Sequence, residues 1–475
     1  MGQIFDVVII GAGASGLTAG IHAAREGADV LILEHMDKAG KKILATGNGK
    51  CNFTNEKQGI AYYRGKNPAF VLPALEQFGL AKTLHFFREL GIYAKPKRDG
   101  YYYPSSGQAA SVLEVLLMEC RKLNVTIEYG IGIRGIQKKD GKFLINTKQG
   151  ILKSLSCVIA TGGKAAKKTG SDGSGIPYIV GFGHKMTDLA PALVGLQGKQ
   201  PFLKDLAGIR AECNVTLYIE NKKIAEDLGE LQLTEFGVSG IPVFQVSRYA
   251  AYGLLQKQQV SVKLNFLPSL SKQQVEGMLA ERFFSYGEGK TAQEALVGLL
   301  PAKLNQVLLK ESGIDGKKPA KACSGAKLTR LAHKIQSLLI EIIGTKGFDG
   351  AQATAGGVDT DEICPDTMES RLVPGLFFSG EVIDIDGMCG GYNLQWAWSS
   401  GFAAGKSAAG YASNSGQKTA NGGKNKHDTN TSAKAPGFSH NRTVGKENLK
   451  DSGHHPRGTS RIPDTETIHR RPKKR

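Results

Sequence analysis

The sequence has little of what marks secreted, membrane or metal-binding proteins. Its seven cysteines include no C-x-x-C pair, which argues against a zinc site, a disulfide framework or a dithiol redox pair and favours a reducing compartment. It contains no run of 18 apolar residues, so we expect no membrane span. The first expected strand begins near residue 5, which leaves no room for a signal peptide. These absences predict a cytoplasmic protein without a metal.

Much of the positive charge belongs to a C-terminal tail. The formal net charge is +18, and residues 413–475 hold 14 Lys and Arg against 5 Asp and Glu. The tail has few large apolar residues, so we predict that it is disordered. Its basic end could hold RNA or an anionic surface by counterion release. A solubilising tail without a partner is the favoured interpretation, so nucleic acid is not the expected partner.

The most informative stretch is a glycine-rich turn after a buried strand. Residues 7–10 are an apolar, β-branched run typical of a parallel strand with both faces covered. Gly11, Gly13 and Gly16 follow as a complete G-x-G-x-x-G. In dinucleotide-binding folds these glycines make the tight turn, let the backbone approach a pyrophosphate and let the helix pack on the strand. Residues 15–25 are then predicted as the helix whose N-terminus faces the diphosphate.

A second strand, residues 28–33, ends in Glu34. This is close to the spacing of about 20 residues at which a carboxylate binds an adenosine ribose. The stretch predicts a dinucleotide-binding βαβ unit and leaves open whether the ligand is FAD or NAD. The alternative is a βαβ unit that only packs. Because the motif does not recur, we expect no separate nicotinamide-binding domain.

Three later stretches combine glycines with a place for a ligand. The loop at 38–55 is rich in glycine and lysine and suits either a flat, partly anionic ligand or plain solvent exposure. A strand at 157–160 stops at Thr161-Gly162-Gly163, a second close backbone approach. After a strand at 376–379, Glu381 is placed to accept hydrogen bonds from a polyol chain. The uncharged helix predicted at 392–410 begins after Gly390-Gly391, which suits negative charge on a bound ring or simple burial.

The predicted fold class is α/β, a Rossmann domain interrupted by an insert with a β-rich part and helices. Within the insert we expect strands at 213–220, 230–234 and 260–266 and helices that include 243–255 and 326–343. The predicted domains are a first FAD-binding part (1–190), the insert (191–344), a second FAD-binding part (345–412) and the tail (413–475).

Five motifs together resemble a known family. GAGASG, TGNGKCNFTN, YYYPSSGQAASVL, VIATGGKAAKKTGSDGSG and GGYNLQWAWSSG are similar to those of the BaiN-like (RsdA/BaiN/aminoacetone-oxidase type) FAD-dependent oxidoreductases over roughly residues 3–411. The resemblance implies FAD in a glutathione-reductase-like domain, with NAD(P)H as the reductant. The best-defined member type is a 3-dehydro-bile acid Δ4,6-reductase, which implies an apolar carboxylate substrate of the steroid type.

The resemblance also implies the residues that bind the cofactor. The pyrophosphate would be held by Gly11, Gly13, Ala14, Ser15 and Gly16, and the adenosine ribose by Glu34. The flavin would lie near Lys42, Asn48, Gly49, Cys51 and Asn52, and the adenylate near Thr161 and Gly162, with Val125 also in the site. The ribityl chain and ring would contact Gly380, Glu381, Gly391, Tyr392 and Asn393.

These expectations lead to a working hypothesis about the reaction. A reductase of conjugated enones would add hydride from the reduced flavin to a 3-oxo-4,6-diene while a protein group protonates the neighbouring carbon. Tyr101, Tyr102, Tyr103 and His184 are the candidate donors, of which Tyr103 and His184 are retained as catalytic candidates. The alternatives are a flavin amine oxidase of small aminoketones and an RNA-associated flavoprotein that uses the basic tail.

Overall fold

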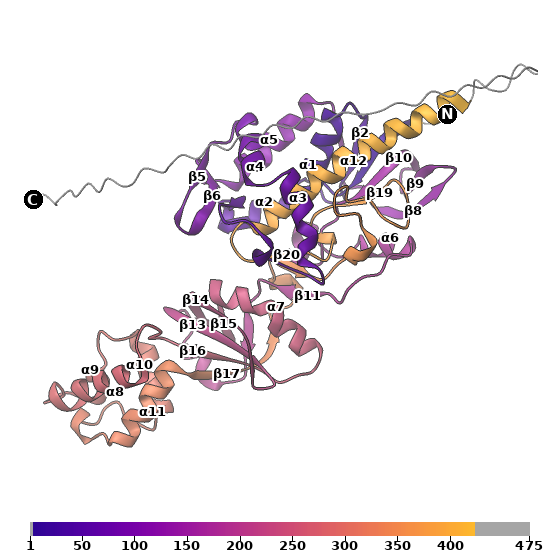
Figure 1. Ribbon diagram of the computed structural model, residues 1–475. Coiled ribbons are helices and arrows are strands. Elements are labelled where there is room, and N and C mark those ends of the chain that lie inside the picture. The colour runs from indigo at the N-terminus through magenta and orange to yellow at the C-terminus, as the bar shows by residue number, and fades with distance from the viewer. Residues whose placement is uncertain (1–2, 423–475) are drawn as a thin grey trace, which may run out of the picture. The chain divides into compact units, whose positions relative to one another are not determined.

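The computed structural model describes residues 3–422 and is built around one mixed sheet (Figure 1). Seven strands form it, in the order β7, β2, β1, β10, β9, β8, with β19 beside β10. Their bounds are β1 Ile4–Ile10, β2 Val30–Leu33, β7 Thr126–Glu128, β8 Ile133–Lys139, β9 Lys142–Thr147, β10 Ile151–Ile159 and β19 Leu376–Phe378. The predicted α/β class with a Rossmann-type parallel sheet is confirmed.

Five of these strands, β7, β2, β1, β10 and β19, point the same way. β1 pairs in parallel with both β2 and β10, and β10 pairs in parallel with β19. Their carboxyl ends therefore meet at one edge of the sheet, where ligands of open α/β sheets bind. The first half of β10 pairs antiparallel with β9, which extends the sheet into the β8–β9 meander.

Two helices pack closely against this sheet, α1 (Ala14–Arg25) and α12 (Tyr392–Gly422). Figure 1 shows α12, in yellow, running beside α1. A Cβ added to Gly401 would lie 2.6 Å from the Ser15 carbonyl oxygen, and one on Gly405 2.2 Å from that of Ala19. The two helix backbones therefore touch, which brings the start of α12 to the same edge as the start of α1.

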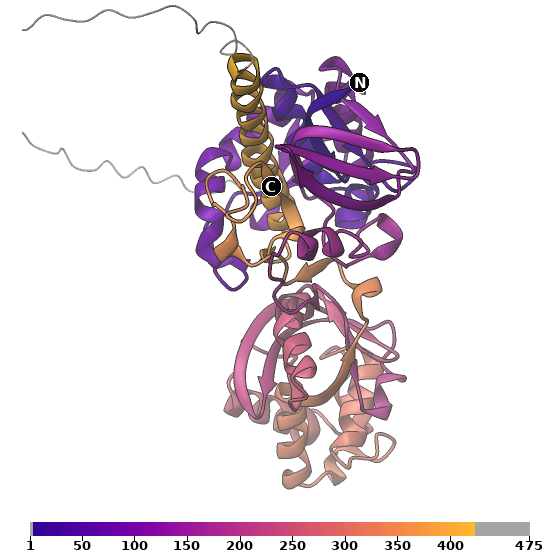
Figure 2. The same cartoon turned by 90° about the vertical axis from the view of Figure 1, so that its right-hand side faces the viewer.

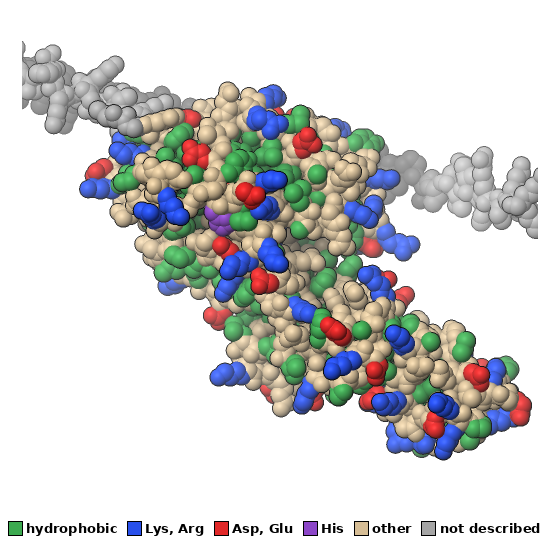
Figure 3. Space-filling model, turned by 180° about the vertical axis from the view of Figure 1, so that it is seen from behind, with side chains coloured by type: hydrophobic (Ala, Val, Ile, Leu, Met, Phe, Trp, Pro, Cys, Tyr) green, Lys and Arg blue, Asp and Glu red, His purple; other side chains and the backbone are tan. Residues whose placement is uncertain are grey.

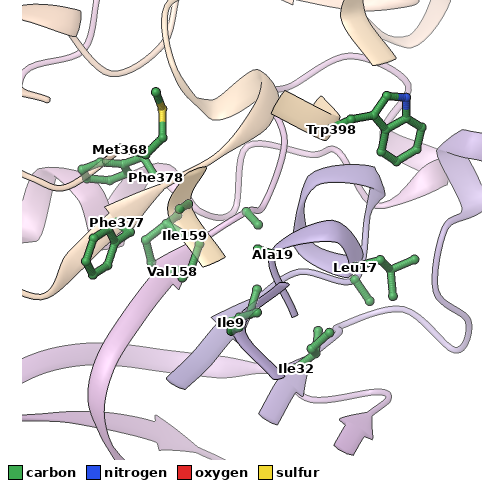
Figure 4. Close-up of a cluster of buried hydrophobic side chains, with 14 of the residues drawn as sticks. Ile9, Leu17, Ala19, Ile32, Val158, Ile159, Met368, Phe377, Phe378 and Trp398 are labelled. Atoms are coloured by element: carbon green, nitrogen blue, oxygen red, sulfur yellow. The ribbon is translucent and has the colours of Figure 1, made fainter. Parts of the chain in front are cut away.

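The sheet and its helices share one hydrophobic core. Figure 4 shows part of it, with Ile9 and Ile32 from the sheet, Leu17 from α1 and Trp398 from α12. The remaining elements around this core are α2 Lys41–Ala45, α3 Leu72–Gln77, α4 Leu80–Glu89, α5 Ala109–Lys122, α6 Ile176–Gly181, β3 Thr54–Asn55, β4 Tyr63–Arg64, β5 Ala94–Pro96, β6 Tyr101–Pro104 and β20 Asp386–Gly387.

A closed six-stranded barrel with its own core interrupts this unit (Figure 2). The strands, in barrel order, are β12 Leu196–Gly198, β15 Gly237–Gly240, β14 Lys222–Thr234, β13 Arg210–Ile219, β16 Val260–Asn265 and β17 Leu338–Thr345. The helices are α7 Ile241–Leu255, α8 Lys272–Ala280, α9 Ala292–Ala295, α10 Ala302–Glu311 and α11 Gly325–Gln336. Antiparallel strands β11 (Ala190–Ala192) and β18 (Ala353–Ala355) carry the chain in and out. The predicted insert of strands and helices is confirmed, and its exact boundaries stay a prediction.

Two local predictions are wrong. The helix predicted over 326–343 ends at Gln336, and Leu338–Thr345 is the last barrel strand, with side chains alternately buried and exposed. The prediction extended the helical spacing of α11 into these residues, although their apolar side chains recur with a period of two. The predicted disordered tail begins too early, since α12 continues to Gly422. Residues 423–475, the rest of that prediction, lie outside the described residues. Within the described part of the chain, no helix is apolar over a length that would cross a membrane.

Candidate functional site

The glycine-rich turn after β1 has the geometry that its sequence predicted. Gly11 has φ +106°, and a Cβ there would lie 2.6 Å from the Ala160 carbonyl oxygen, so the turn needs glycine. A Cβ on Gly16 would lie 1.9 Å from the Gly11 carbonyl oxygen. Gly13, the residue before α1, has open space around the same position. The N-terminus of α1 is therefore bare toward that space, as an anion site requires.

Glu34 is fixed by the backbone at the end of β2. Its Oε2 accepts a hydrogen bond from the Ala12 N–H at 2.8 Å, and its Oε1 accepts one from the Met36 N–H at 2.8 Å. The residue is 9% exposed. Because each carboxylate oxygen can accept a second hydrogen bond, Glu34 can still bind the hydroxyls of a ribose.

Two buried hydroxyls lie near this end of the site without a partner. Among the described residues, Thr161 Oγ1, which follows β10, and Ser171 Oγ are buried and have no hydrogen-bond partner. Leaving a buried polar atom unpaired costs about 1–3 kcal/mol. Both oxygens would be satisfied by a polar ligand.

A second set of polar groups lies at the end of β19. Lys42 Nζ is 2.6 Å from Glu381 Oε2, and Glu381 Oε1 accepts a hydrogen bond from the Thr354 N–H at 2.6 Å. Glu381 follows Gly380, whose N–H donates to Ser400 Oγ and whose carbonyl accepts from Trp396 Nε1. Helix α12 thus anchors the turn that presents Glu381.

The start of α12 completes the site. Asn393 Oδ1 accepts a hydrogen bond from the Gly387 N–H at 2.9 Å, and Asn393 Nδ2 donates to the Gly387 carbonyl at 2.8 Å. A Cβ on Gly391 would lie 2.7 Å from the Thr54 carbonyl and 3.0 Å from the Asn52 side chain, so this position needs glycine. The ring of Tyr392 stacks on that of Tyr62, with 4.7 Å between the ring centres. Asn393 is thereby held on the cavity wall while Tyr392 packs away from it.

A cavity of about 290 Å³ joins these groups. Its volume lies just below the range of about 300–1,000 Å³ that is typical of ligand and cofactor pockets. Ten of the predicted cofactor residues line it: Gly11, Gly13, Ala14, Ser15, Glu34, Lys42, Thr161, Gly162, Glu381 and Asn393. The bare helix N-terminus, the open space at Gly13 and the unpaired hydroxyls together fit an elongated, anionic, hydroxyl-rich ligand such as FAD.

Other predicted cofactor residues do not line the cavity. Gly16, Gly380, Gly391 and Tyr392 support its walls, and Asn48, Gly49, Cys51 and Asn52 lie in the adjoining loop. Cys51 is fully buried, and burial raises the pKa of its thiol to about 11, so it stays protonated at neutral pH. Val125 comes directly before the edge strand β7 and is not among the described residues that line the cavity.

Sequence reasoning missed part of the wall. Ile131, Gly132 and Ile133, which follow β7, line the cavity together with Tyr178, Gln352 and Ala353. The apolar wall near Glu34 carries no motif, so only the position of β7 next to β2 could have pointed to it.

The two catalytic candidates have different surroundings. His184 is 3% exposed, its Nδ1 lies 3.1 Å from Glu362 Oε2 and its Nε2 lies 2.7 Å from Ser370 Oγ. Burial lowers its pKa, and among the described residues it is not part of the cavity wall. His184 is therefore held by these two contacts outside the cavity wall, and its catalytic role stays a prediction.

Tyr103 lies on β6 and packs near the glycine loop. A Cβ on Gly47 would lie 3.4 Å from Tyr103 Cε1, and Lys97 Nζ lies 4.7 Å from the centre of its ring. Tyr101, on the same strand, packs against Gly390: a Cβ there would lie 2.9 Å from Tyr101 Cε1. Burial raises the pKa of both phenols, that of Tyr101 to about 12. Both therefore keep their protons at neutral pH.

Comparison with known proteins agrees with this geometry. The model of the HI0933-like protein Rossmann domain matches residues 5–407. Over 404 residues the chain is 44% identical to the 3-dehydro-bile acid delta(4,6)-reductase of Clostridium scindens, covering 84% of this chain and 98% of that protein. It is 32% identical over 410 residues to the ribosomal RNA dihydrouridine synthase of Escherichia coli, covering 84% and 96%. The protein of that name from Haemophilus influenzae is 31% identical over 411 residues, covering 85% and 98%.

Proposed function

Because the chain belongs to the HI0933-like family of FAD-dependent oxidoreductases, we propose that it reduces carbon–carbon double bonds conjugated to a carbonyl. Its substrates are 3-oxo-4,6-diene steroids of the bile acid type, its electron donor is NAD(P)H, and it works in the cytoplasm. The observation that carries the cofactor assignment is the single cavity that runs from Glu34 to Lys42, Glu381 and Asn393. The substrate follows from the 44% identical reductase.

In this proposal the residues of the cavity bind and orient the cofactor. The N-terminus of α1 at Gly13 stabilises the pyrophosphate, and Glu34 accepts hydrogen bonds from the adenosine ribose. The Lys42–Glu381 pair and Asn393 hold the other end. When bound and reduced, FAD supplies the hydride that the carbon β to the carbonyl accepts.

The protein must also deliver a proton to the neighbouring carbon. Tyr101 lies beside Gly390 and Tyr103 lies beside Gly47. Burial raises the pKa of both phenols, so both stay protonated at neutral pH. A neutral tyrosine can donate a hydrogen bond to the carbonyl or a proton to carbon. Tyr101 is the stronger candidate because it touches Gly390, next to the start of α12.

The printed names of the relatives fit one reaction class. A delta(4,6)-reductase saturates double bonds conjugated to a steroid carbonyl. A dihydrouridine synthase adds two hydrogens across the double bond of uracil, which is also conjugated to a carbonyl. Both reactions need a hydride at the double-bond carbon farther from the carbonyl and a proton at the double-bond carbon nearer to it. The reaction class is therefore supported by both names, whereas the substrate is supported by the higher identity of the first.

Anaerobic mixing tests the main proposal. The FAD-loaded protein is first mixed with NADH or NADPH and then with a 3-oxo-4,6-diene bile acid, while the flavin absorbance is followed. We expect bleaching by one of the nucleotides and recovery with the dienone. Absence of bleaching with both nucleotides contradicts the proposed donor, and a flavin that stays bleached after the dienone contradicts the proposed substrate.

RNA modification is the second candidate function, because the Escherichia coli and Haemophilus influenzae relatives are named for it. On the face shown in Figure 3, lysine and arginine side chains are interspersed with acidic ones, so that face does not form the continuous basic surface that RNA binding requires. Ribosomal RNA transcript offered to the reduced protein in place of the dienone decides between the two. Reoxidation of the flavin by the transcript, but not by the dienone, favours this candidate.

A further inference from the structure

Helix α7 of the barrel reaches the segment that leads into α12. The Cys389 N–H donates to Gln245 Oε1 at 3.0 Å, and Gln245 Nε2 donates to the Cys389 carbonyl at 3.5 Å. Arg248, about one helical turn further on, donates from Nε to Asp386 Oδ1 at 3.0 Å. Two side chains of one barrel helix thus hold the segment 386–389.

The same segment is bonded to the wall of the cofactor cavity. The Gly387 backbone exchanges two hydrogen bonds with the side chain of Asn393, at 2.9 and 2.8 Å, and Asn393 lines the cavity. A continuous chain of hydrogen-bonded and covalent contacts therefore runs from Gln245 to Asn393.

The segment needs such support because of its composition. Gly390 and Gly391 have φ values of +135° and +95° and no side chains of their own to pack. Asn55 Nδ2 donates to the Gly390 carbonyl at 2.9 Å on the Rossmann side. Gln245 is the matching contact on the barrel side. Without it, the residue before the glycine pair loses both of its side-chain hydrogen bonds to the barrel.

An ion pair between Arg248 and Asp386 lies beside this contact, and burial raises the pKa of Asp386 to about 7 although the Arg248 cation opposes the shift. The side chains of Arg248 and Asp386 are 14% and 4% exposed, and the guanidinium carbon of Arg248 lies 5.1 Å from the centre of the Tyr252 ring. A buried carboxylate that loses its partner is strongly destabilising. Changes at Arg248 therefore threaten folding, whereas Gln245 is neutral and can be changed with less risk.

We propose that Gln245 is a positioning residue, through which the barrel sets the position of the segment 386–391 and thereby of Asn393 and the start of α12. The inference rests on the proposed binding of FAD in this cavity. It gives the barrel a second task besides any contact with substrate, which is to order the wall at the Asn393 end of the cavity.

The test uses Gln245→Leu, with exposed Gln256→Leu at the end of the same helix as the matched control. The dissociation constant of FAD, from flavin fluorescence, and the midpoint potential of the bound flavin are measured for each full-length variant. We expect FAD binding about tenfold weaker and a shifted potential for Gln245→Leu, with no change for Gln256→Leu. Gln245→Glu keeps an acceptor for the Cys389 N–H, so we expect its FAD binding to be only about threefold weaker than that of the wild type.

The outcomes separate this inference from the proposed function. A wild-type chain that binds no FAD contradicts the proposed function. A wild-type chain that binds FAD, together with a Gln245→Leu variant equal to Gln256→Leu in both affinity and potential, overturns the positioning role. If Gln245→Leu has no cooperative melting transition, Gln245→Glu compared with Gln256→Glu decides by the same two measurements.

Discussion

Lys42 and Glu381 form an ion pair at 2.6 Å on the wall of the cavity, although the first follows β2 and the second follows β19. Their side chains are 26% and 19% exposed. The pair connects the loop that follows β2 with the turn that follows β19. It is one of the contacts that join the N-terminal and C-terminal parts of the Rossmann unit, and it lies at the proposed flavin site.

Replacing Lys42 with Met tests this pair. The variant leaves the Glu381 carboxylate without its cation next to the proposed flavin, and hydrogen bonds to charged groups contribute about 1.5–3 kcal/mol. We expect FAD binding at least tenfold weaker in a fluorescence titration. Lys57→Met, which removes an exposed lysine of the same domain, is the control. Equal affinities of the two variants would contradict a role for Lys42 at the cofactor.

Two glycines of one motif should respond differently to alanine. The Gly13→Ala methyl group enters open space beside the N-terminus of α1, whereas that of Gly16→Ala collides with the Gly11 carbonyl oxygen. We expect Gly13→Ala to leave the melting temperature of the FAD-free protein unchanged and to weaken FAD binding by tenfold or more. Gly16→Ala should lower the free energy of unfolding by about 2 kcal/mol or more even without FAD. Thermal melts with and without FAD distinguish the two, and tight FAD binding by Gly13→Ala would contradict the proposed pyrophosphate site.

His22 should make the fold sensitive to acid. It is 8% exposed among the rings of Phe78, Phe86 and Phe402, and burial, followed by the nearby charges of Arg25 and Lys406, lowers its pKa from 6.5 to about 3. Below pH 6.5 the unfolded chain binds a proton that the folded chain does not, so stability falls as the pH falls from 6.5 toward 3.

At pH 5 this difference amounts to about 2 kcal/mol. Urea unfolding of the FAD-free protein at pH 7 and pH 5 measures it. Between pH 7 and pH 5, the free energy of unfolding of a His22→Phe variant should fall by about 2 kcal/mol less than that of the wild type. Equal losses for the two proteins would show that His22 is not the group responsible.

The tyrosines of β6 can be tested as proton donors. Tyr101→Phe should slow reoxidation of the reduced flavin by a dienone by about tenfold or more, because general acid catalysis typically contributes at least that much. Reduction of the flavin by the nicotinamide nucleotide should not change. Tyr103→Phe, on the same face of the strand, serves as the comparison. If neither variant slows reoxidation, the donor is a different group.

The parts of the site that the sequence could predict have local signatures. The glycines of the first turn and Glu34 lie within one βαβ unit, where spacing alone determines the geometry. Glu381 was predicted from a strand and the turn that follows it, and Asn393 from the family resemblance. The Lys42–Glu381 contact could not be derived from spacing, because it depends on how β2 and β19 flank β1 and β10.

Other parts had no local signature. The wall formed by residues 131–133 offers only apolar surface and backbone, which leave no motif in the sequence. Val125, which was predicted to be in the site, lies on the other side of β7 in the sequence. β17 follows α11 almost directly, so its alternation was read as the continuation of a helix. The role of Gln245 depends on a contact between the barrel and the Rossmann unit, for which sequence periodicity carries no information.

We propose above that the cavity between Glu34 and Asn393 holds one FAD. Calorimetric titration of the flavin-free full-length chain with FAD, run in parallel on Gly13→Ala, tests it most directly. We expect one FAD bound per wild-type chain and binding at least tenfold weaker to the variant. A wild-type chain that binds no FAD, or a variant that binds it equally well, would contradict an FAD site in this cavity.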